Sequence, residues 1–169
     1  RGVFYTDNGG DSWQHILNLS DSVGVSDLVW DSNNEILYAA SWQIPDGKAS
    51  RVYKSTDLGK SWTQLDLQFE GGDKIGRIGL AMSHAWPETL YALVDNRNPR
   101  NEPEQTHIGA TVFRSDNFGK TWKKTNTELL DNYGGFGWAF GDIVLHPNRR
   151  DELFILGVHL MHSKNGGKT

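Results

Sequence analysis

The chain has 169 residues, of which 19 are glycine, seven are tryptophan and none is cysteine, and its formal net charge is −4. The lack of cysteine excludes disulfide bonds, cysteine-based metal sites and thiol nucleophiles. The slight excess of acidic residues provides no basic surface for nucleic acid, and no stretch approaches the roughly eighteen apolar residues of a membrane span. We therefore expect neither a nucleic-acid partner nor a membrane-spanning segment.

A short motif occurs four times along the chain. It consists of a serine or threonine, an aspartate or asparagine two residues later, a glycine four residues later and, in three copies, a tryptophan seven residues later. The copies begin at Thr6, Ser55, Ser115 and Ser163, so that successive copies lie 49, 60 and 48 residues apart. A near-constant spacing of this length indicates an internal structural repeat. We call these segments boxes, and their motif positions are Asn8, Gly10 and Trp13, then Asp57, Gly59 and Trp62, then Asn117, Gly119 and Trp122, then Asn165 and Gly167.

Each box is predicted to be a hairpin turn. The aspartate or asparagine side chain accepts hydrogen bonds from backbone N–H groups of its own turn, and the glycine adopts a positive φ without steric cost. The strand-like runs 3–5, 52–54 and 112–114 lead into the first three boxes. The tryptophan begins the following strand, and we expect its large ring to pack between repeats. The boxes are therefore interpreted as structural, and Asp57 as a turn residue rather than a catalyst.

Two further strand signals recur between the boxes: an apolar run and, after a turn, a run that combines leucine with an aromatic residue. Each repeat therefore contains four strands, and four-stranded units of about 40 to 50 residues in a radial array are the blades of a β-propeller. A solenoid of β units is the structural alternative, although its repeat is usually shorter. The runs lie at 28–30, 78–82 and 143–145, and at 36–40, 90–94 and 153–156.

The sequence thus predicts an all-β fold, a β-propeller of four-stranded antiparallel blades. About three and a half blades are expected: residues 1–19 form the end of one blade, 20–67 and 68–126 form two blades, and 127–169 form an incomplete blade. A propeller closes its ring to remove exposed strand edges and typically needs four to eight blades. We therefore expect these residues to be part of a larger ring, with the remaining blades supplied by the same or an associated chain.

The boxes resemble the Asp-box, or BNR, repeat, whose consensus is Ser-x-Asp-x-Gly-x-Thr-Trp. Propellers with this repeat include sialidases, xyloglucan-cleaving glycoside hydrolases, sortilin-type receptor domains and photosystem assembly factors. The runs 1–4, 37–43, 76–81 and 90–93 are most similar to secreted bacterial sortilin-like propellers, which are often labelled glycosyl hydrolases. Three of the four boxes carry asparagine in place of the consensus aspartate, and asparagine can still serve the turn. The resemblance implies that the boxes lie on the face opposite the usual ligand site.

A ligand site is accordingly expected among the loops of the other face. The longest of these loops, 95–110, accounts for the 60-residue spacing, and long insertions on a repeat scaffold tend to lie on a binding face. The loop 127–139 is rich in glycine and aromatic residues, and flat aromatic rings suit sugar rings. The alternatives are a solvated long loop and aromatic side chains that simply cover the end of a blade. The ligand-binding candidates are Trp42, Asp46, Arg77, Asp95, Arg97, His107, Tyr133 and Trp138.

Glycoside hydrolysis requires two carboxylates facing each other about 5–10 Å apart. Asp27 and Asp142 precede corresponding apolar strands and are the best candidates for such a pair. The alternative is that they cap or tie the ends of the inner strands. A sialidase would need three arginines that grip a carboxylate, and no convincing triad is present. The six histidines show no metal-ligand spacing, so neither a metal nor a cofactor is predicted.

Two functions of different classes remain open. The first is an interaction module that binds a protein, a peptide or a glycan through its loop face. The second is a glycoside hydrolase, xyloglucanase-like or sialidase-like, that uses paired carboxylates. Fold alone does not choose between them. Because propellers with this repeat are usually extracytoplasmic, we expect a secreted, periplasmic or cell-surface location in a bacterial envelope.

Overall fold

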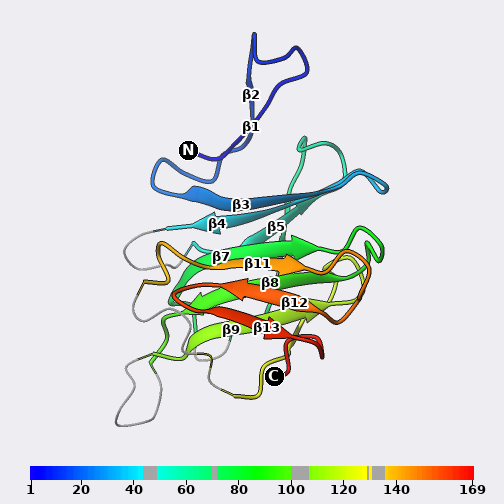
Figure 1. Ribbon diagram of the computed structural model, residues 1–169. Coiled ribbons are helices and arrows are strands. Elements are labelled where there is room, and N and C mark those ends of the chain that lie inside the picture. Colours follow the sequence, from blue (N-terminus) through cyan, green and yellow to red (C-terminus); the bar gives the residue numbers. More distant parts are fainter. Residues whose placement is uncertain (44–48, 70–71, 100–106, 129, 131–135) are drawn as a thin grey trace.

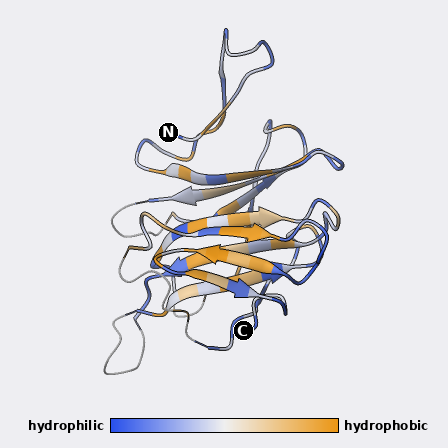
Figure 2. Cartoon of the chain, viewed as in Figure 1, coloured by the Kyte–Doolittle hydropathy of each residue, from blue (hydrophilic) through white to orange (hydrophobic). Residues whose placement is uncertain are grey.

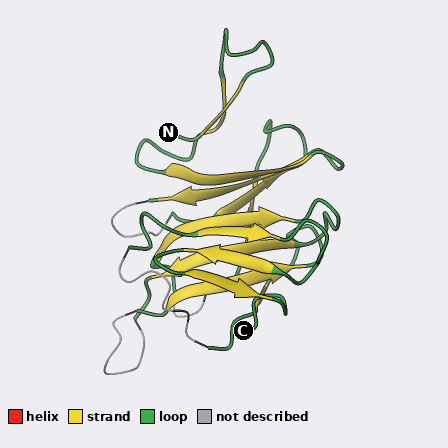
Figure 3. Cartoon of the chain, viewed as in Figure 1, coloured by secondary structure: helices red, strands yellow, loops and turns green. Residues whose placement is uncertain are grey.

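The computed structural model describes residues 1–43, 49–69, 72–99, 107–128, 130 and 136–169. Within these residues the chain forms strands, turns and loops, without a helix (Figure 3). The strands of the described residues are β1 (Val3–Tyr5), β2 (Gln14–Leu17), β3 (Gly24–Asp31), β4 (Ile36–Trp42), β5 (Val52–Ser55), β6 (Thr63–Leu65), β7 (Ile75–Met82), β8 (Leu90–Asn96), β9 (Gly109–Ser115), β10 (Lys123–Lys124), β11 (Asp142–Leu145), β12 (Leu153–Leu156) and β13 (Leu160–Ser163).

Within each sheet, every strand pairs antiparallel with its neighbour in sequence, as short hairpin connections dictate. The sheets have the orders β1-β2, β3-β4-β5-β6, β7-β8-β9-β10 and β11-β12-β13. In Figure 1 they follow one another from the β1–β2 hairpin near the N-terminus to the β11–β13 sheet near the C-terminus. This is the arrangement of successive propeller blades that the repeats predict.

The core lies between consecutive sheets, and β8 contributes to it on both of its faces. Leu90, Ala92 and Val94 pack in the cluster shared with the β3–β6 sheet. Tyr91 and Leu93 pack in the cluster shared with the β11–β13 sheet. Because successive side chains of a strand point to opposite faces, a strand covered on both sides needs an unbroken apolar run. Figure 2 shows the hydrophobic residues gathered on the strands and the hydrophilic residues on the connecting turns.

The second box shows how the motif closes its hairpin. Oδ1 of Asp57 accepts hydrogen bonds from Ser55 Oγ and from the backbone N–H of Ser61, each at 2.8 Å, and Oδ2 accepts one from Ser61 Oγ. The N–H of Gly59 donates to Ser55 Oγ at 2.8 Å, and this glycine has φ = +83°. The motif residues are therefore those that the turn requires, because their side chains satisfy backbone donors that no strand partner can reach.

The asparagine boxes keep the same geometry with one bond reversed. Oδ1 of Asn117 accepts from Ser115 Oγ at 3.0 Å and from the N–H of Thr121 at 2.9 Å, like the aspartate of the second box. Its Nδ2, however, donates to Thr121 Oγ1 at 2.8 Å, whereas Asp57 accepts a hydrogen bond from the matching hydroxyl. Since the hydroxyl can rotate to donate or accept, both residues fit the turn.

The second box is expected to make stability depend on pH in a way that the asparagine boxes do not. Hydrogen bonds, first of all from the Ser61 hydroxyl, lower the pKa of Asp57 to about 2. The folded state thus favours the ionised carboxylate, so the stabilisation is complete above the unfolded pKa of about 4 and is lost as the pH falls through about 2. In Asp57→Asn, thermal unfolding followed by circular dichroism should lose that part of its pH dependence. Asn117→Asp is the matched control and should add a similar acid-sensitive step; equal profiles for all three proteins would contradict the expectation.

The boxes also join neighbouring sheets. Trp62 Nε1 donates to the carbonyl oxygen of Ile16 in the preceding hairpin at 2.8 Å, and Tyr38 Oη donates to the carbonyl oxygen of Phe118 in the following box at 3.2 Å. The rings of Trp62 and Trp122 pack against hydrophobic clusters, as predicted. Trp13 differs from the expectation, since it is 59% exposed.

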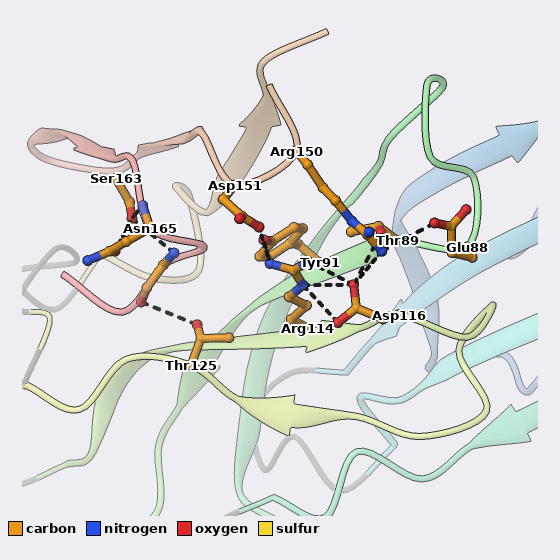
Figure 4. Close-up of polar contacts among 11 residues, drawn as sticks. Glu88, Thr89, Tyr91, Arg114, Asp116, Thr125, Arg150, Asp151, Ser163 and Asn165 are labelled. Atoms are coloured by element: carbon orange, nitrogen blue, oxygen red, sulfur yellow. Dashed lines mark hydrogen bonds and ion pairs between the residues drawn. The ribbon is translucent and has the colours of Figure 1, made fainter. Parts of the chain in front are cut away.

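A polar network ties β9 to the connection between β11 and β12 on the box side of the sheets (Figure 4). Arg114 donates to both carboxylate oxygens of Asp116, to Asp151 and, at 2.9 Å, to the hydroxyl of Tyr91. Arg150 adds a bond to Asp116 at 3.3 Å. The guanidinium group therefore links two sheets through its planar fork of donors, a geometry that lysine cannot reproduce.

Candidate functional site

The side chains predicted to bind a ligand lie at the edge of the sheets opposite the boxes. Because neighbouring strands run antiparallel, β7 and β11 begin at this edge and β8 ends there. We call this edge the loop face, and it lies on the left of the sheets in Figure 1. The connections before β7, after β8 and before β11 therefore meet around one area.

Asp27, one of the two candidate catalytic carboxylates, is bound to backbone groups. Its Oδ1 accepts from the N–H of Leu28 at 2.8 Å, and its Oδ2 accepts from the N–H of Leu80 on β7 at 2.7 Å. Both oxygens are thus engaged by backbone donors, and the bond to Oδ2 joins β3 to β7. This is the chemistry of a tie between inner strands, the alternative that the sequence left open. A catalytic role for Asp27 stays a prediction.

Asp142, the other candidate, is paired with Arg77 across two sheets. The Nη2 of Arg77 lies 3.1 Å from Asp142 Oδ1, and the Nη1 donates to the carbonyl oxygen of Ala139 at 3.0 Å. The side chain of Asp142 is 61% exposed and that of Arg77 only 23%. The Arg77–Asp142 pair leaves the Asp142 carboxylate at the surface beside β7. The bond from Arg77 to Ala139 fixes the residues just before β11 onto β7.

Residues 136–140, which we call the aromatic turn, are held in a defined conformation by these contacts. The N–H groups of Ala139 and Phe140 both donate to the carbonyl oxygen of Phe136, at 2.9 and 3.1 Å. The side chains of Phe136, Trp138 and Phe140 are 52%, 54% and 44% exposed. The turn therefore presents three aromatic side chains to solvent from a backbone that is anchored on β7. Such a surface is typical of a binding site.

Asp95 lies under the aromatic turn, near the end of β8. A Cβ atom added to Gly137 would fall 2.4 to 2.7 Å from the carboxyl atoms of Asp95, and one added to Gly76 would fall 2.1 Å from its Oδ2. Burial raises the pKa of Asp95, while the positive charges of Arg97 and His107 lower it in part. A partly buried carboxyl with a shifted pKa at such a face is a candidate functional group.

The base of the long loop is fastened to the loop that precedes β7. Asn98, which is buried, accepts from the N–H of Lys74 at 3.1 Å and donates to the carbonyl oxygen of Gly72 at 2.9 Å. The N–H of Arg97 donates to the carbonyl oxygen of Lys74, and that of Ile108 to the carbonyl oxygen of Asn98. Arg97 and His107 are thus carried on an anchored base, where both are exposed.

The structure brings Arg77, Asp95 and Asp142 together with Trp138 at the loop face, and it carries Arg97 and His107 beside them. Trp42 lies at the end of β4, opposite Gly24 of β3. Asp46 and Tyr133 lie outside the described residues. Sequence reasoning missed Phe140 and the two glycines next to Asp95. The alternation of aromatic and small residues along 136–141 is the signal that could have found the aromatic turn.

The third box has a counterpart among known protein families. Residues 112–125, which contain the hydrogen-bonded turn around Asn117, match the family model described as BNR-Asp box repeat. The third box is thus similar to a BNR-Asp box repeat. The other three boxes make corresponding bonds between their hydroxyl and their aspartate or asparagine, so the same turn recurs in all four.

Solved structures with a similar fold include two GH74 enzymes. The GH74 enzyme of Niastella koreensis matches with a TM-score of 0.71 at 21% identity, over 98% of this chain and 25% of that chain. The GH74 xyloglucanase of Xanthomonas campestris matches with a TM-score of 0.62 at 19% identity, over 92% of this chain and 22% of that chain. The chain thus spans about a quarter of the length of these structures. Together with the BNR-Asp box turns, the likeness confirms the predicted all-β propeller fold.

A search of curated proteins returned no match. Among the described residues, no helix is long and apolar enough to cross a membrane. The same residues contain no group of three or more histidine, aspartate or glutamate side chains placed to hold a metal ion.

Proposed function

We propose that this part of a propeller binds a glycan through the loop face, with the aromatic turn as the contact surface. The observation that carries the proposal is the exposure of Phe136, Trp138 and Phe140 on one anchored turn. A sugar ring has an apolar C–H face that packs on an aromatic ring, and hydroxyl groups that need polar partners. The carboxylate of Asp142 and the carboxyl of Asp95 supply such partners next to the turn.

A glycan fits these features of the loop face better than a protein or peptide ligand does. A protein partner would favour a broad surface, whereas the aromatic turn presents its three exposed aromatic side chains within five consecutive positions. The polar groups beside them are ionisable and exposed or partly exposed, as suits hydroxyl recognition. We also propose a location outside the cytoplasm, where polymeric glycans are encountered; fractionation of producing cells, probed with an antibody to the chain, tests this location.

A second candidate function is glycoside hydrolysis, which the likeness to two GH74 enzymes favours. Because this chain spans only about a quarter of those enzymes, hydrolysis would require a complete propeller with further blades. Further blades are proposed partners of this chain for the same reason. Val144, Leu156 and Leu160 of the β11–β13 sheet are 51%, 41% and 72% exposed, and another blade would cover these apolar side chains.

The glycan proposal is tested by replacing the central aromatic side chain. We expect Trp138→Ala to weaken binding of a responsive glycan about 30-fold, the loss of about 2 kcal/mol for a contact that anchors the ligand. Binding is measured first on an array of neutral and acidic glycans that includes xyloglucan oligosaccharides, and then by calorimetry with the glycan that binds best.

Trp13→Ala is the matched control, because Trp13 is similarly exposed, at 59%, but lies in a box at the opposite edge. It should bind like the unchanged chain. Absence of any glycan signal, or an equal loss in both variants, would contradict the proposal. Release of reducing ends from xyloglucan in the same samples would instead support hydrolysis.

A further inference from the structure

The carboxyl group of Asp95 occupies a space that two glycines leave open. Ideal Cβ atoms at Gly76 and Gly137 would lie 2.1 Å and 2.5 Å from its Oδ2, closer than any side chain can approach. Both glycines are buried, and neither has a positive φ that would itself require glycine. The two positions therefore have no side chain because the carboxyl group passes between them.

Other carboxylates close to the core accept hydrogen bonds from donors of their own chain, whereas Asp95 accepts none from the described residues. Asp31, which is 1% exposed, accepts from the N–H groups of Asn33 and Asn34 and from Asn34 Nδ2. Asp27 accepts from two backbone N–H groups. No donor to the oxygens of Asp95 is found within the described part of the chain. The donors to this partly buried carboxyl are therefore supplied by water or by a bound group.

The two glycines also connect Asp95 to the rest of the loop face. Gly137 directly precedes Trp138, and Gly76 directly precedes Arg77. Arg97 and His107, at the base of the long loop, are the positively charged groups that act on Asp95, and the Arg77–Asp142 pair lies at the same loop face. The terminal nitrogens of Arg77 are already bound to Asp142 and to the Ala139 carbonyl oxygen, so this arginine is engaged within the site.

We propose that Asp95 is the polar recognition group of the loop-face site, where it accepts hydrogen bonds from adjacent hydroxyls of a neutral sugar seated on the aromatic turn. The inference rests on the proposed function and assigns the ligand class. Two carboxylate oxygens match two neighbouring hydroxyl donors, which a sugar carries on successive carbons. The Asp95 carboxylate would repel the carboxylate of an acidic sugar seated at the same place, so we expect a neutral glycan to be preferred there.

The test compares Asp95→Asn with Asp11→Asn, which removes an exposed carboxylate of the first box. The probes are a neutral xyloglucan oligosaccharide and a sialylated oligosaccharide, titrated into the 169-residue chain between pH 7 and pH 4. We expect Asp95→Asn to bind the neutral probe about tenfold more weakly at pH 7, since one charge-assisted hydrogen bond of this kind is worth that much. Unchanged protein should lose affinity as Asp95 becomes protonated, and Asp95→Asn should not show this loss.

A stability measurement separates recognition from a structural role. The folded state raises the pKa of Asp95, so the ionised group destabilises the fold above that pKa and the penalty vanishes as the pH falls below the unfolded value. Asp95→Asn should therefore melt at the same or a higher temperature at pH 7, with the difference closing in acid. A lower melting temperature at pH 7 would show that Asp95 is structural and would overturn the inference.

The outcomes also distinguish this inference from the glycan proposal. If Trp138→Ala loses binding and Asp95→Asn retains it, the glycan site stands and the role of Asp95 is refuted. Preference for the sialylated probe would refute the assignment to neutral sugars. If the unchanged chain binds neither probe, nor any glycan on the array, both proposals fail.

Discussion

Gly79→Ala is expected to lower the free energy of unfolding by about 3 kcal/mol, at the upper end of the range for overpacked cores. An ideal Cβ at this position on β7 would lie 2.0 Å from the carbonyl oxygen of Gly141 and 3.5 Å from Cα of Asp142. These are backbone atoms, which cannot rotate out of the way as a flexible side chain can. The inner strands β7 and β11 would have to separate, and the hydrophobic cluster that contains Ala81 and Ile143 would lose packing contacts.

Gly24→Ala provides the matched control for this substitution. Gly24 also lies on an inner strand without a positive φ, but the nearest atom to an added Cβ is the Trp42 carbonyl oxygen at 3.8 Å, an ordinary contact. Chemical denaturation of both variants measures the difference. Gly24→Ala should unfold within about 1 kcal/mol of the unchanged chain, because backbone entropy is then the main change. Similar midpoints for the two variants would show that the strands at Gly79 can move apart at little cost.

The strands and boxes could be predicted from sequence because their signals are local. The run 90–94 is apolar or aromatic at every position, and the box around Asp57 recurs at near-constant spacing with the residues that its turn needs. Such patterns depend on neighbours a few residues apart. They identified the strands and their order.

The organisation of the site could be predicted only in part, because it depends on contacts between sheets. Asp95 was a candidate, but nothing in the sequence relates it to Gly76 and Gly137, which lie on other strands and connections. Likewise, the bond from the Leu80 N–H to Asp27 depends on how β3 and β7 are placed relative to each other. Sequence reasoning therefore supplied the residue types, and the packing of successive blades supplied their partners.

At Gly76, Gly79 and Gly137 another group takes the place that a Cβ atom would occupy. Inner strands of successive blades approach closely, so that positions facing the next blade have little room for a side chain. At Gly79 the space is filled by the backbone of the next blade, and at the other two positions it is filled by the Asp95 carboxyl group. The Asp95 carboxyl group near the loop face thus lies between Gly76 of its own sheet and Gly137 of the connection that precedes β11.

Arg114→Ala is expected to lower the free energy of unfolding by about 2 kcal/mol. The guanidinium group lies 5.4 Å over the ring of Tyr91, binds its hydroxyl, and pairs with Asp116 and Asp151. The two carboxylates are 51% and 55% exposed, so water can replace much of what they lose. Tyr91 is fully buried, and its hydroxyl would be left without this donor. Most of the loss should therefore come from Tyr91.

A double-mutant cycle with Tyr91→Phe tests that origin by chemical denaturation. If the unsatisfied hydroxyl causes the loss, Arg114→Ala should cost much less when Tyr91 is already phenylalanine. Arg150→Ala is the control within the same network, because Arg150 is 40% exposed and also binds Asp116. Its effect should stay below about 1 kcal/mol, as for exposed ion pairs. An equal cost of Arg114→Ala in both backgrounds would instead assign the stabilisation to the ion pairs with Asp116 and Asp151. The pair with Asp151 joins the β7–β10 sheet to the connection between β11 and β12.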